Sequence, residues 1–319
     1  MLQPIVLIPA WRHGEMTPWG GETLKTLFGK DIPGPRTGES LELSAIPGLE
    51  SRDAQGRTLT ELIALHGQAL TGTRVGSPFP LLLKLIDARE RLSVQVHPGD
   101  AYAQQHHSKP GKNEGWVVLQ AAPGAQLIMG LRGGTTREVL RAASRKGREM
   151  ESLLRSIEVH PGDVFYIPEG TVHAIGAGLV LYEIQQSSDI TYRLYDWERV
   201  DKYGHGRQLH LEDSLAVINP AAQPLPEQAS VISQETNGLH ERLLDTSYFR
   251  LDRLSDCEGF TWISEPARCS VLTALSPVAL AWEGHSLQLS TGQSALLPAQ
   301  GYPLRLSGKS ALLASPATN

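Results

Sequence analysis

Cysteine and long apolar runs are both scarce in this chain of 319 residues. Its two cysteines, Cys257 and Cys269, are too few for a disulfide framework, and we expect both to be reduced and structural. No stretch approaches the roughly eighteen apolar residues of a membrane-spanning helix. Residues 1–5 lack the basic and apolar regions of a secretory signal. The sequence therefore predicts a cytoplasmic protein that does not act in a membrane.

Positive charge is also in the minority. The chain has 29 Lys and Arg against 34 Asp and Glu, a formal net charge of −5, and a pI of about 6.1. This balance argues against nucleic acid as a main partner. A small anionic substrate stays possible, because a few local cations can outweigh the global sign. The length suits one large or two medium domains.

One short strand carries residues typical of a metal site. In residues 92–97 aliphatic and polar residues alternate, so Gln95 and His97 project the same way, about 7 Å apart at Cα. If Glu114 and His173 converge with them inside a barrel, the four side chains form a mixed nitrogen and oxygen site. Three strong ligands and one weak one leave room for water or substrate, as a catalytic zinc site requires.

The second stretch is more specific. Residues Gly162, Pro168, Gly170 and His173 fit the pattern Gly-x5-Pro-x-Gly-x2-His without a gap. Two turns around a short strand would aim His173 inward. This resembles the second signature of the cupin superfamily, small β jelly-roll barrels that hold a metal in their mouths. A single buried histidine is more often hydrogen-bonded than metal-bound, but here strand parity, glycine turns and a carboxylate agree.

The pattern of apolar residues predicts a mainly β protein, and the resemblance to the cupin signature implies a cupin-type jelly-roll barrel with a few helices in residues 1–235. A second, smaller β jelly roll without metal is expected in residues 236–319. Strands are expected at residues 81–86, 92–97, 117–119, 126–129, 164–167, 179–185 and 191–197. Helices are expected at 22–28, 58–70, 136–157 and 212–218, and a linker at 219–234. Beyond Phe249 we expect short strands at 249–254, 260–264, 271–275, 278–282, 287–289, 294–297 and 304–306.

Further motifs follow one another along residues 5–220. They are Trp19-Gly20-Gly21, Thr37-Gly38-Glu39-Ser40, Lys84-Leu85-Ile86-Asp87-Ala88, Leu92-Ser93-Val94-Gln95-Val96-His97-Pro98, Gly111-Lys112-Asn113-Glu114, Pro168-Glu169-Gly170-Thr171-Val172-His173-Ala174-Ile175, Thr191-Tyr192-Arg193-Leu194-Tyr195-Asp196-Trp197 and Arg207-Gln208-Leu209-His210-Leu211. In this order they resemble the class I mannose-6-phosphate isomerases (phosphomannose isomerases), particularly the short bacterial form. The last hundred residues match only in general β character.

The resemblance implies one Zn²⁺ per chain, bound by Gln95, His97, Glu114 and His173. It also implies catalytic roles for Arg193, Lys112 and Asp189, and contacts of Lys84, Lys112 and Arg193 with a small phosphosugar. By contrast, His106 and His107 are expected to lie in a polar loop that faces solvent, and His160 is expected to end a strand. None of the three is expected to be a ligand.

The implied reaction interconverts mannose 6-phosphate and fructose 6-phosphate through an enediol. Zinc would polarise the carbonyl or hold the sugar oxygens, and Arg193 would stabilise the developing oxyanion. Asp189, Glu183 and a zinc-bound water stay open as the base. Isomerisation of another phosphorylated sugar, an iron-dependent cupin oxygenase and a non-catalytic sugar-binding cupin remain alternatives, and the oligomeric state is open.

Overall fold

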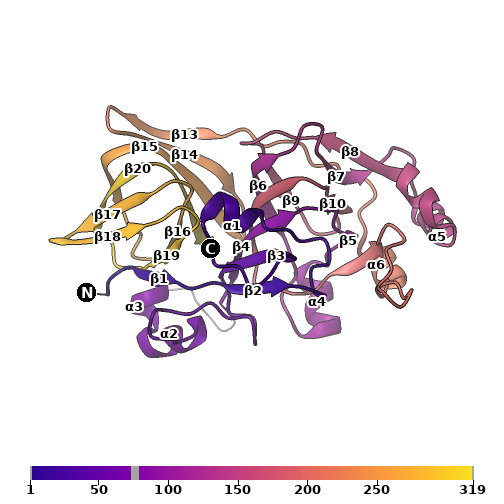
Figure 1. Ribbon diagram of the computed structural model, residues 1–319, viewed down its shortest axis with the longest axis horizontal. Helices are drawn as coiled ribbons and strands as arrows, with labels where there is room; N and C mark the ends of the chain where they lie inside the picture. The colour runs from indigo at the N-terminus through magenta and orange to yellow at the C-terminus, as the bar shows by residue number, and fades with distance from the viewer. Residues whose placement is uncertain (1, 73–78, 318–319) are drawn as a thin grey trace.

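The computed structural model describes residues 2–72 and 79–317. Within these residues, the strands form three antiparallel sheets of six, five and nine strands, and only short helices accompany them. The predicted mainly β fold with a cupin-type barrel is therefore confirmed. None of the helices in the described ranges is long and apolar enough to cross a membrane. Figure 1 shows the barrel and the nine-stranded sheet lying side by side along the longest axis.

The barrel consists of the six-stranded and the five-stranded sheet. In order across the first sheet the strands are β2 (Ala10–His13), β3 (Thr37–Leu43), β4 (Leu81–Ala88), β11 (Leu179–Gln186), β6 (Glu114–Ala121) and β9 (Val164–Ile167). Across the second they are β12 (Tyr192–Tyr195), β5 (Val94–Val96), β10 (His173–Ile175), β7 (Gln126–Leu131) and β8 (Leu154–Glu158). Strands β1 to β3 had not been predicted, because residues 1–50 are rich in Gly and Pro.

The nine-stranded sheet takes strands from both ends of the chain. Its main order is β1 (Ile5–Leu7), β19 (Ser294–Leu297), β16 (Ser270–Ala274), β20 (Pro303–Pro316), β15 (Phe249–Ile263), β14 (Gly238–Asp245) and β13 (Ser230–Glu235). Strand β17 (Val278–Trp282) pairs with both β20 and β18 (His285–Leu289). The boundary predicted between residues 235 and 236 thus falls inside the β13–β14 hairpin. The linker prediction was wrong for residues 230–234, where pairing with β14 makes an exposed edge strand.

Packing on both faces explains why the central strands of the barrel are mostly apolar, apart from the polar residues that line the cavity or are buried in pairs. The six-stranded sheet packs one face against the five-stranded sheet, around Trp116, Phe165 and Met129. Its other face packs against the nine-stranded sheet, where Leu83 and Ile184 join a cluster with Phe249 and its neighbours. Every residue of β4 and β11 is buried. A strand buried on both faces needs a nearly continuous apolar run instead of alternation.

Two predicted helices lie where expected, and a third is divided in two. Helix α1 (Thr23–Phe28) and α6 (Leu211–Val217) lie where expected. Thr58 caps α2 (Leu59–His66) and exchanges hydrogen bonds with Glu61, which forms a capping box. The helix ends at Gly67, whose φ of 52° lies in the left-handed region, and α3 (Gln68–Thr71) follows.

The predicted helix at residues 136–157 was wrong over its last part. Helix α5 (Arg137–Ser144) ends before Gly147, a short 3-10 helix η1 (Gly147–Leu153) follows, and residues 154–158 form β8. The apolar residues of β8 have helical spacing, but its pairing with β7 outweighs this local preference for a helix. Conversely, α4 (Asp100–His107) was not expected, because it buries only Ala103 and shows no apolar stripe.

The two cysteines are free and buried, as predicted. Cys257 lies on β15 and Cys269 directly before β16. Burial raises the pKa of Cys257 to about 11 and that of Cys269 to about 12. Since the thiolate is the reactive form, both thiols are expected to be inert near neutral pH.

Candidate metal centre and substrate cavity

The four predicted metal ligands come from both sheets of the barrel. Gln95 lies on β5, His97 directly follows that strand, and His173 begins β10, which pairs with β5 in the register His173 to Gln95. Glu114 begins β6 in the facing six-stranded sheet. The glycine turns of the sequence pattern make this possible, because Gly162 and Gly170 have φ values of 98° and 77°.

Three of these side chains converge in the buried interior. Nε2 of His173 lies 3.1 Å from Oε1 of Glu114, and Nε2 of His97 lies 3.6 Å from Oε2. One ligand atom from each of the three residues lies within 4.8 Å of the others, and all three residues are buried. This is the predicted arrangement, with both imidazoles facing one carboxylate.

The second nitrogen of each imidazole is held by the backbone. Nδ1 of His97 lies 2.9 Å from the carbonyl oxygen of Ile190, and Nδ1 of His173 lies 2.9 Å from that of Thr171. A carbonyl oxygen only accepts, so each Nδ1 carries a proton, which turns each Nε2 toward Glu114 as the ring nitrogen that can bind a metal. Metal-binding histidines are commonly oriented by such contacts.

Local electrostatics favour the protonation states that bind a cation. Burial, followed by the charge of Lys112, holds the pKa of His97 well below its usual value. Burial alone would raise the pKa of Glu114, but Lys112 and the two histidines outweigh it, and the pKa is lowered well below its usual value. The cluster therefore combines a neutral imidazole with an ionised carboxylate, the forms that metals need.

The cluster also contains buried polar atoms without hydrogen bonds. In the described part of the chain, Nε2 of His97 and both carboxylate oxygens of Glu114 have no hydrogen-bond partner. Lys112 offsets part of the charge of Glu114, but burying polar atoms without hydrogen bonds is costly. A cation between them would remove that cost, so the residues fit a metal ion.

Gln95 lies at the edge of the same cluster. Its Nε2 is 3.3 Å from Nε2 of His173. A rotation of the amide by 180° would place its oxygen at that position, because the two ends of a carboxamide have nearly the same shape. Gln95 therefore lies within reach of the same cluster.

A cavity of about 420 Å³ adjoins the cluster, and Gln95 and Lys112 form part of its wall. The charged residues lining it are Arg12, Lys84, Lys112, Arg193, Arg207, Glu39, Glu183 and Asp189. Five cations against three carboxylates give this wall a formal charge of +2, on a chain whose net charge is −5. The cavity is therefore suited to an anionic ligand.

Lys84 and Glu183 form a buried ion pair in this wall. Nζ of Lys84 lies 2.7 Å from Oε1 of Glu183 and 3.6 Å from Glu39. Burial alone would lower the pKa of Lys84, but these two carboxylates outweigh it, and the pKa is raised. Trp116 donates to the other oxygen of Glu183 at 2.9 Å. Both oxygens of Glu183 are thus engaged, which makes it a poor proton acceptor.

The other predicted catalytic residues also line the cavity, with different partners. Lys112 lies 3.1 Å from Oε2 of Glu114. Asp189 accepts a hydrogen bond of 2.8 Å from Lys109. Burial alone would raise the pKa of Asp189, but the hydrogen bond and charge of Lys109 outweigh it, so the pKa is lowered.

Arg193 differs from the lysines because it has no carboxylate within ion-pair distance among the described residues. It lies on β12, opposite Gln95 in the register with β5. Its Nη1 donates to the carbonyl oxygen of Gln208 at 2.8 Å, while its buried Nε has no partner in the ranges described. Burial and the nearby Arg207 lower its pKa, but an arginine remains charged.

Three histidines lie outside the cluster, as predicted. His106 and His107 are exposed on α4, where His107 contacts the Tyr192 hydroxyl at 2.6 Å. His160 is exposed in the turn before β9. The sequence reasoning did not identify Arg12 or Arg207 as cavity residues, and it gave no role to Glu39, although Glu39 lies in a family motif.

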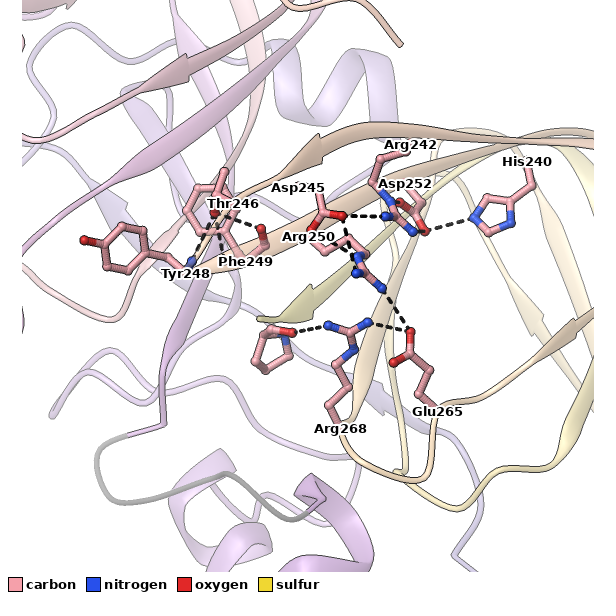
Figure 2. A network of polar contacts seen from close by, with 11 residues as sticks. His240, Arg242, Asp245, Thr246, Tyr248, Phe249, Arg250, Asp252, Glu265 and Arg268 are labelled. Atoms are coloured by element: carbon pink, nitrogen blue, oxygen red, sulfur yellow. Dashed lines mark hydrogen bonds and ion pairs between the residues drawn. The ribbon is translucent and has the colours of Figure 1, made fainter. Parts of the chain in front are cut away.

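The strand that carries Glu114 is supported from outside the barrel. A Cβ atom on Gly115 would lie 2.4 Å from Cδ1 of Leu244 and 3.3 Å from Cε2 of Phe249. Both residues belong to the β14–β15 hairpin of the nine-stranded sheet. Hydrogen bonds to Thr246 hold its turn, and a network of ion pairs that includes Asp245 holds the adjoining strands (Figure 2).

Comparisons with known proteins agree with this geometry. The family profile "Phosphomannose isomerase type I, catalytic domain" matches residues 13–114. A mannose-6-phosphate isomerase of Streptococcus mutans is 44% identical over 227 residues, covering 69% of this chain and 71% of its own. For the mannose-6-phosphate isomerase ManA of Bacillus subtilis the identity is 41% over 241 residues, covering 74% and 75%. This chain belongs to the type I phosphomannose isomerase family.

The similarity to this family extends over the whole fold. The crystal structure of the mannose 6-phosphate isomerase from Bacillus subtilis superposes with a TM-score of 0.89 at 30% identity, covering 98% of this chain and 99% of that one. The resemblance inferred from the motifs is therefore confirmed. The superposition includes the nine-stranded sheet, for which the sequence motifs gave only general β character.

The contact at Gly115 yields a first prediction. Gly115→Ala should overpack the β6–β14 contact, which typically costs about 1–3 kcal/mol in unfolding free energy. It should also weaken divalent metal binding, because the change adjoins Glu114. Titration with a metal-competing dye measures the metal affinity, and urea unfolding measures the stability.

A compensating variant makes this prediction specific. Leu244→Ala in the Gly115→Ala background removes the atom nearest to the new methyl group and should restore part of the metal affinity. Wild-type metal affinity in Gly115→Ala, or no recovery in the double variant, would contradict a role of this contact.

Proposed function

We propose that this chain is a zinc-dependent mannose-6-phosphate isomerase, which interconverts mannose 6-phosphate and fructose 6-phosphate through an enediol. The observation that carries the proposal is the His97, Glu114 and His173 cluster beside a cavity wall of formal charge +2. Family membership and relatives named mannose-6-phosphate isomerase support this substrate. A cytoplasmic location is proposed with it, in keeping with two free cysteines.

The donor set supports zinc as the metal. Two imidazole nitrogens, a carboxylate and an amide oxygen would come from His97, His173, Glu114 and Gln95. Nitrogen and oxygen donors with at most four protein ligands suit a catalytic zinc ion. When bound, zinc would supply Lewis-acid chemistry toward the sugar oxygens of the enediol.

The cavity supports a phosphosugar rather than a neutral sugar. Its volume of about 420 Å³ lies within the usual range for small-molecule sites. Lys84, Lys112 and Arg193 are proposed substrate-binding residues, and all three line it. Lys84 and Lys112 already form ion pairs with Glu183 and Glu114, at 2.7 and 3.1 Å. They are therefore proposed to attract the phosphosugar partly through the positive potential that they add to the cavity wall.

The isomerisation needs a base that takes the C2 proton and returns it to C1. Asp189 is a better candidate than Glu183, because only its Oδ1 accepts a side-chain hydrogen bond within the described residues. Its lowered pKa keeps it ionised, although it also makes it a weak base. Lys112, in contact with Glu114, is proposed to donate a hydrogen bond to a reacting sugar oxygen.

Arg193 is proposed to stabilise the negative charge of the enediolate. Its guanidinium has no carboxylate partner among the described residues, so its charge is available to the substrate. Fixed donors in a buried site are most effective where charge develops in the transition state.

The direct test of the proposed function is a coupled isomerase assay with and without a chelator. Activity should require mannose 6-phosphate, fall after metal removal and return with zinc. His173→Ala should lose the zinc, about one ion per chain in the wild type by mass spectrometry. Exposed His160→Ala is the matched control and should keep both metal and activity. A fully zinc-loaded His173→Ala protein would refute the ligand assignment.

The role of Arg193 predicts a separation of chemistry from binding. Arg193→Ala should lower kcat strongly and change KM less, since the charge it meets forms mainly in the transition state. Arg193→Lys should recover only part of kcat, because an ammonium group lacks the planar arrangement of N–H donors of a guanidinium. Zinc content should stay unchanged. An unaltered kcat in a folded, zinc-loaded Arg193→Ala protein would exclude this role.

A further inference from the structure

Arg12 is a cavity residue outside every motif that the sequence reasoning identified. It lies on β2, the edge strand of the six-stranded sheet, while Arg193 lies on β12, the edge strand of the five-stranded sheet. Both arginines line the same cavity. The two facing sheets of the barrel thus each contribute one arginine to it.

The other cations of this wall are already matched by carboxylates. Lys84 lies within 3.6 Å of both Glu183 and Glu39. Lys112 lies 3.1 Å from Glu114. Arg207 donates two hydrogen bonds, of 2.7 and 2.6 Å, to the carboxylate of Asp196. The two lysines are also almost fully buried, with side chains 5% and 6% exposed.

Arg12 keeps donors available to a ligand. Its Nη1 donates to Oε2 of Glu39 at 3.1 Å, and Glu39 also faces Lys84. Its Nε and Nη2 have no partner in the part of the chain described, and its side chain is 25% exposed. A guanidinium can hold a carboxylate on one edge and phosphate oxygens on another, with two parallel donors toward the phosphate.

We propose that Arg12 binds the phosphate group of the substrate, while Arg193, opposite Gln95, faces the reacting end. A hexose 6-phosphate carries its reacting carbons and its phosphate at opposite ends, and Arg12 contacts none of His97, Glu114 and His173 within the described residues. Arg12 is therefore placed for recognition and not for chemistry. The identity of the ligand rests on the proposed function, whereas the anion site itself does not.

The kinetic test compares Arg12→Ala and Arg12→Lys with wild type. Losing a charge-assisted hydrogen bond to an anion should raise KM for mannose 6-phosphate by about tenfold to over a hundredfold, with a far smaller change in kcat. Arg12→Lys should recover part of the loss. Arg148→Ala is the matched control, because Arg148 also pairs with a carboxylate, Glu198, but is 82% exposed and outside the cavity wall.

A binding test separates the inference from the proposed function. Calorimetry with inorganic phosphate on the zinc-loaded proteins should show binding to wild type and Arg148→Ala, and clearly weaker binding to Arg12→Ala. Thermal unfolding checks that each variant is folded, and Arg12→Gln, which can still donate to Glu39, replaces an unfolded Arg12→Ala.

The outcomes are distinguishable. A folded Arg12 variant with unchanged KM and unchanged phosphate binding overturns the inference while the isomerase function stands. A wild type that binds phosphate through Arg12 but does not turn over mannose 6-phosphate overturns the proposed function and leaves the anion site in place.

Discussion

The structure depends on one buried carboxylate. Glu114 lies between two imidazoles whose proton-bearing nitrogens face backbone carbonyls, and neither of its oxygens makes a hydrogen bond within the described residues. Lys112, at 3.1 Å, offsets part of its charge. A charge buried this way is stable only with a cation close to it. The barrel therefore carries a centre that could hold a metal ion, and the charged cavity lies directly beside it.

Three layers of sheet hold this centre. Its three residues come from the two facing sheets of the barrel, so their spacing depends on how those sheets pack. The nine-stranded sheet supports the outer face of the same strands and contacts Gly115, the neighbour of Glu114, through Leu244 and Phe249. This gives the second β unit a physical role in the site, although its own strands contribute no residue to the metal cluster within the described ranges.

The structural features that depend on a local sequence pattern were predicted correctly. Strand alternation placed Gln95 and His97 on one face, and the glycine turns placed His173 beside them. The features that depend on pairing between strands far apart in the sequence were not predicted. Residues 154–158 have helical spacing but pair with β7, and Arg12 reaches the cavity only because β2 pairs with β3, far along the chain. Helix α4 was missed because it buries only Ala103 and has no apolar stripe.

The central claim is that Glu114, His97 and His173 hold one zinc ion. X-ray diffraction from crystals of the zinc-loaded protein, recorded on both sides of the zinc absorption edge, tests it most directly. The account predicts one anomalous peak inside the barrel, about 2.0–2.1 Å from Nε2 of each histidine and about 2.0–2.2 Å from a Glu114 oxygen. A peak elsewhere, or no peak in a fully active crystal, would contradict it.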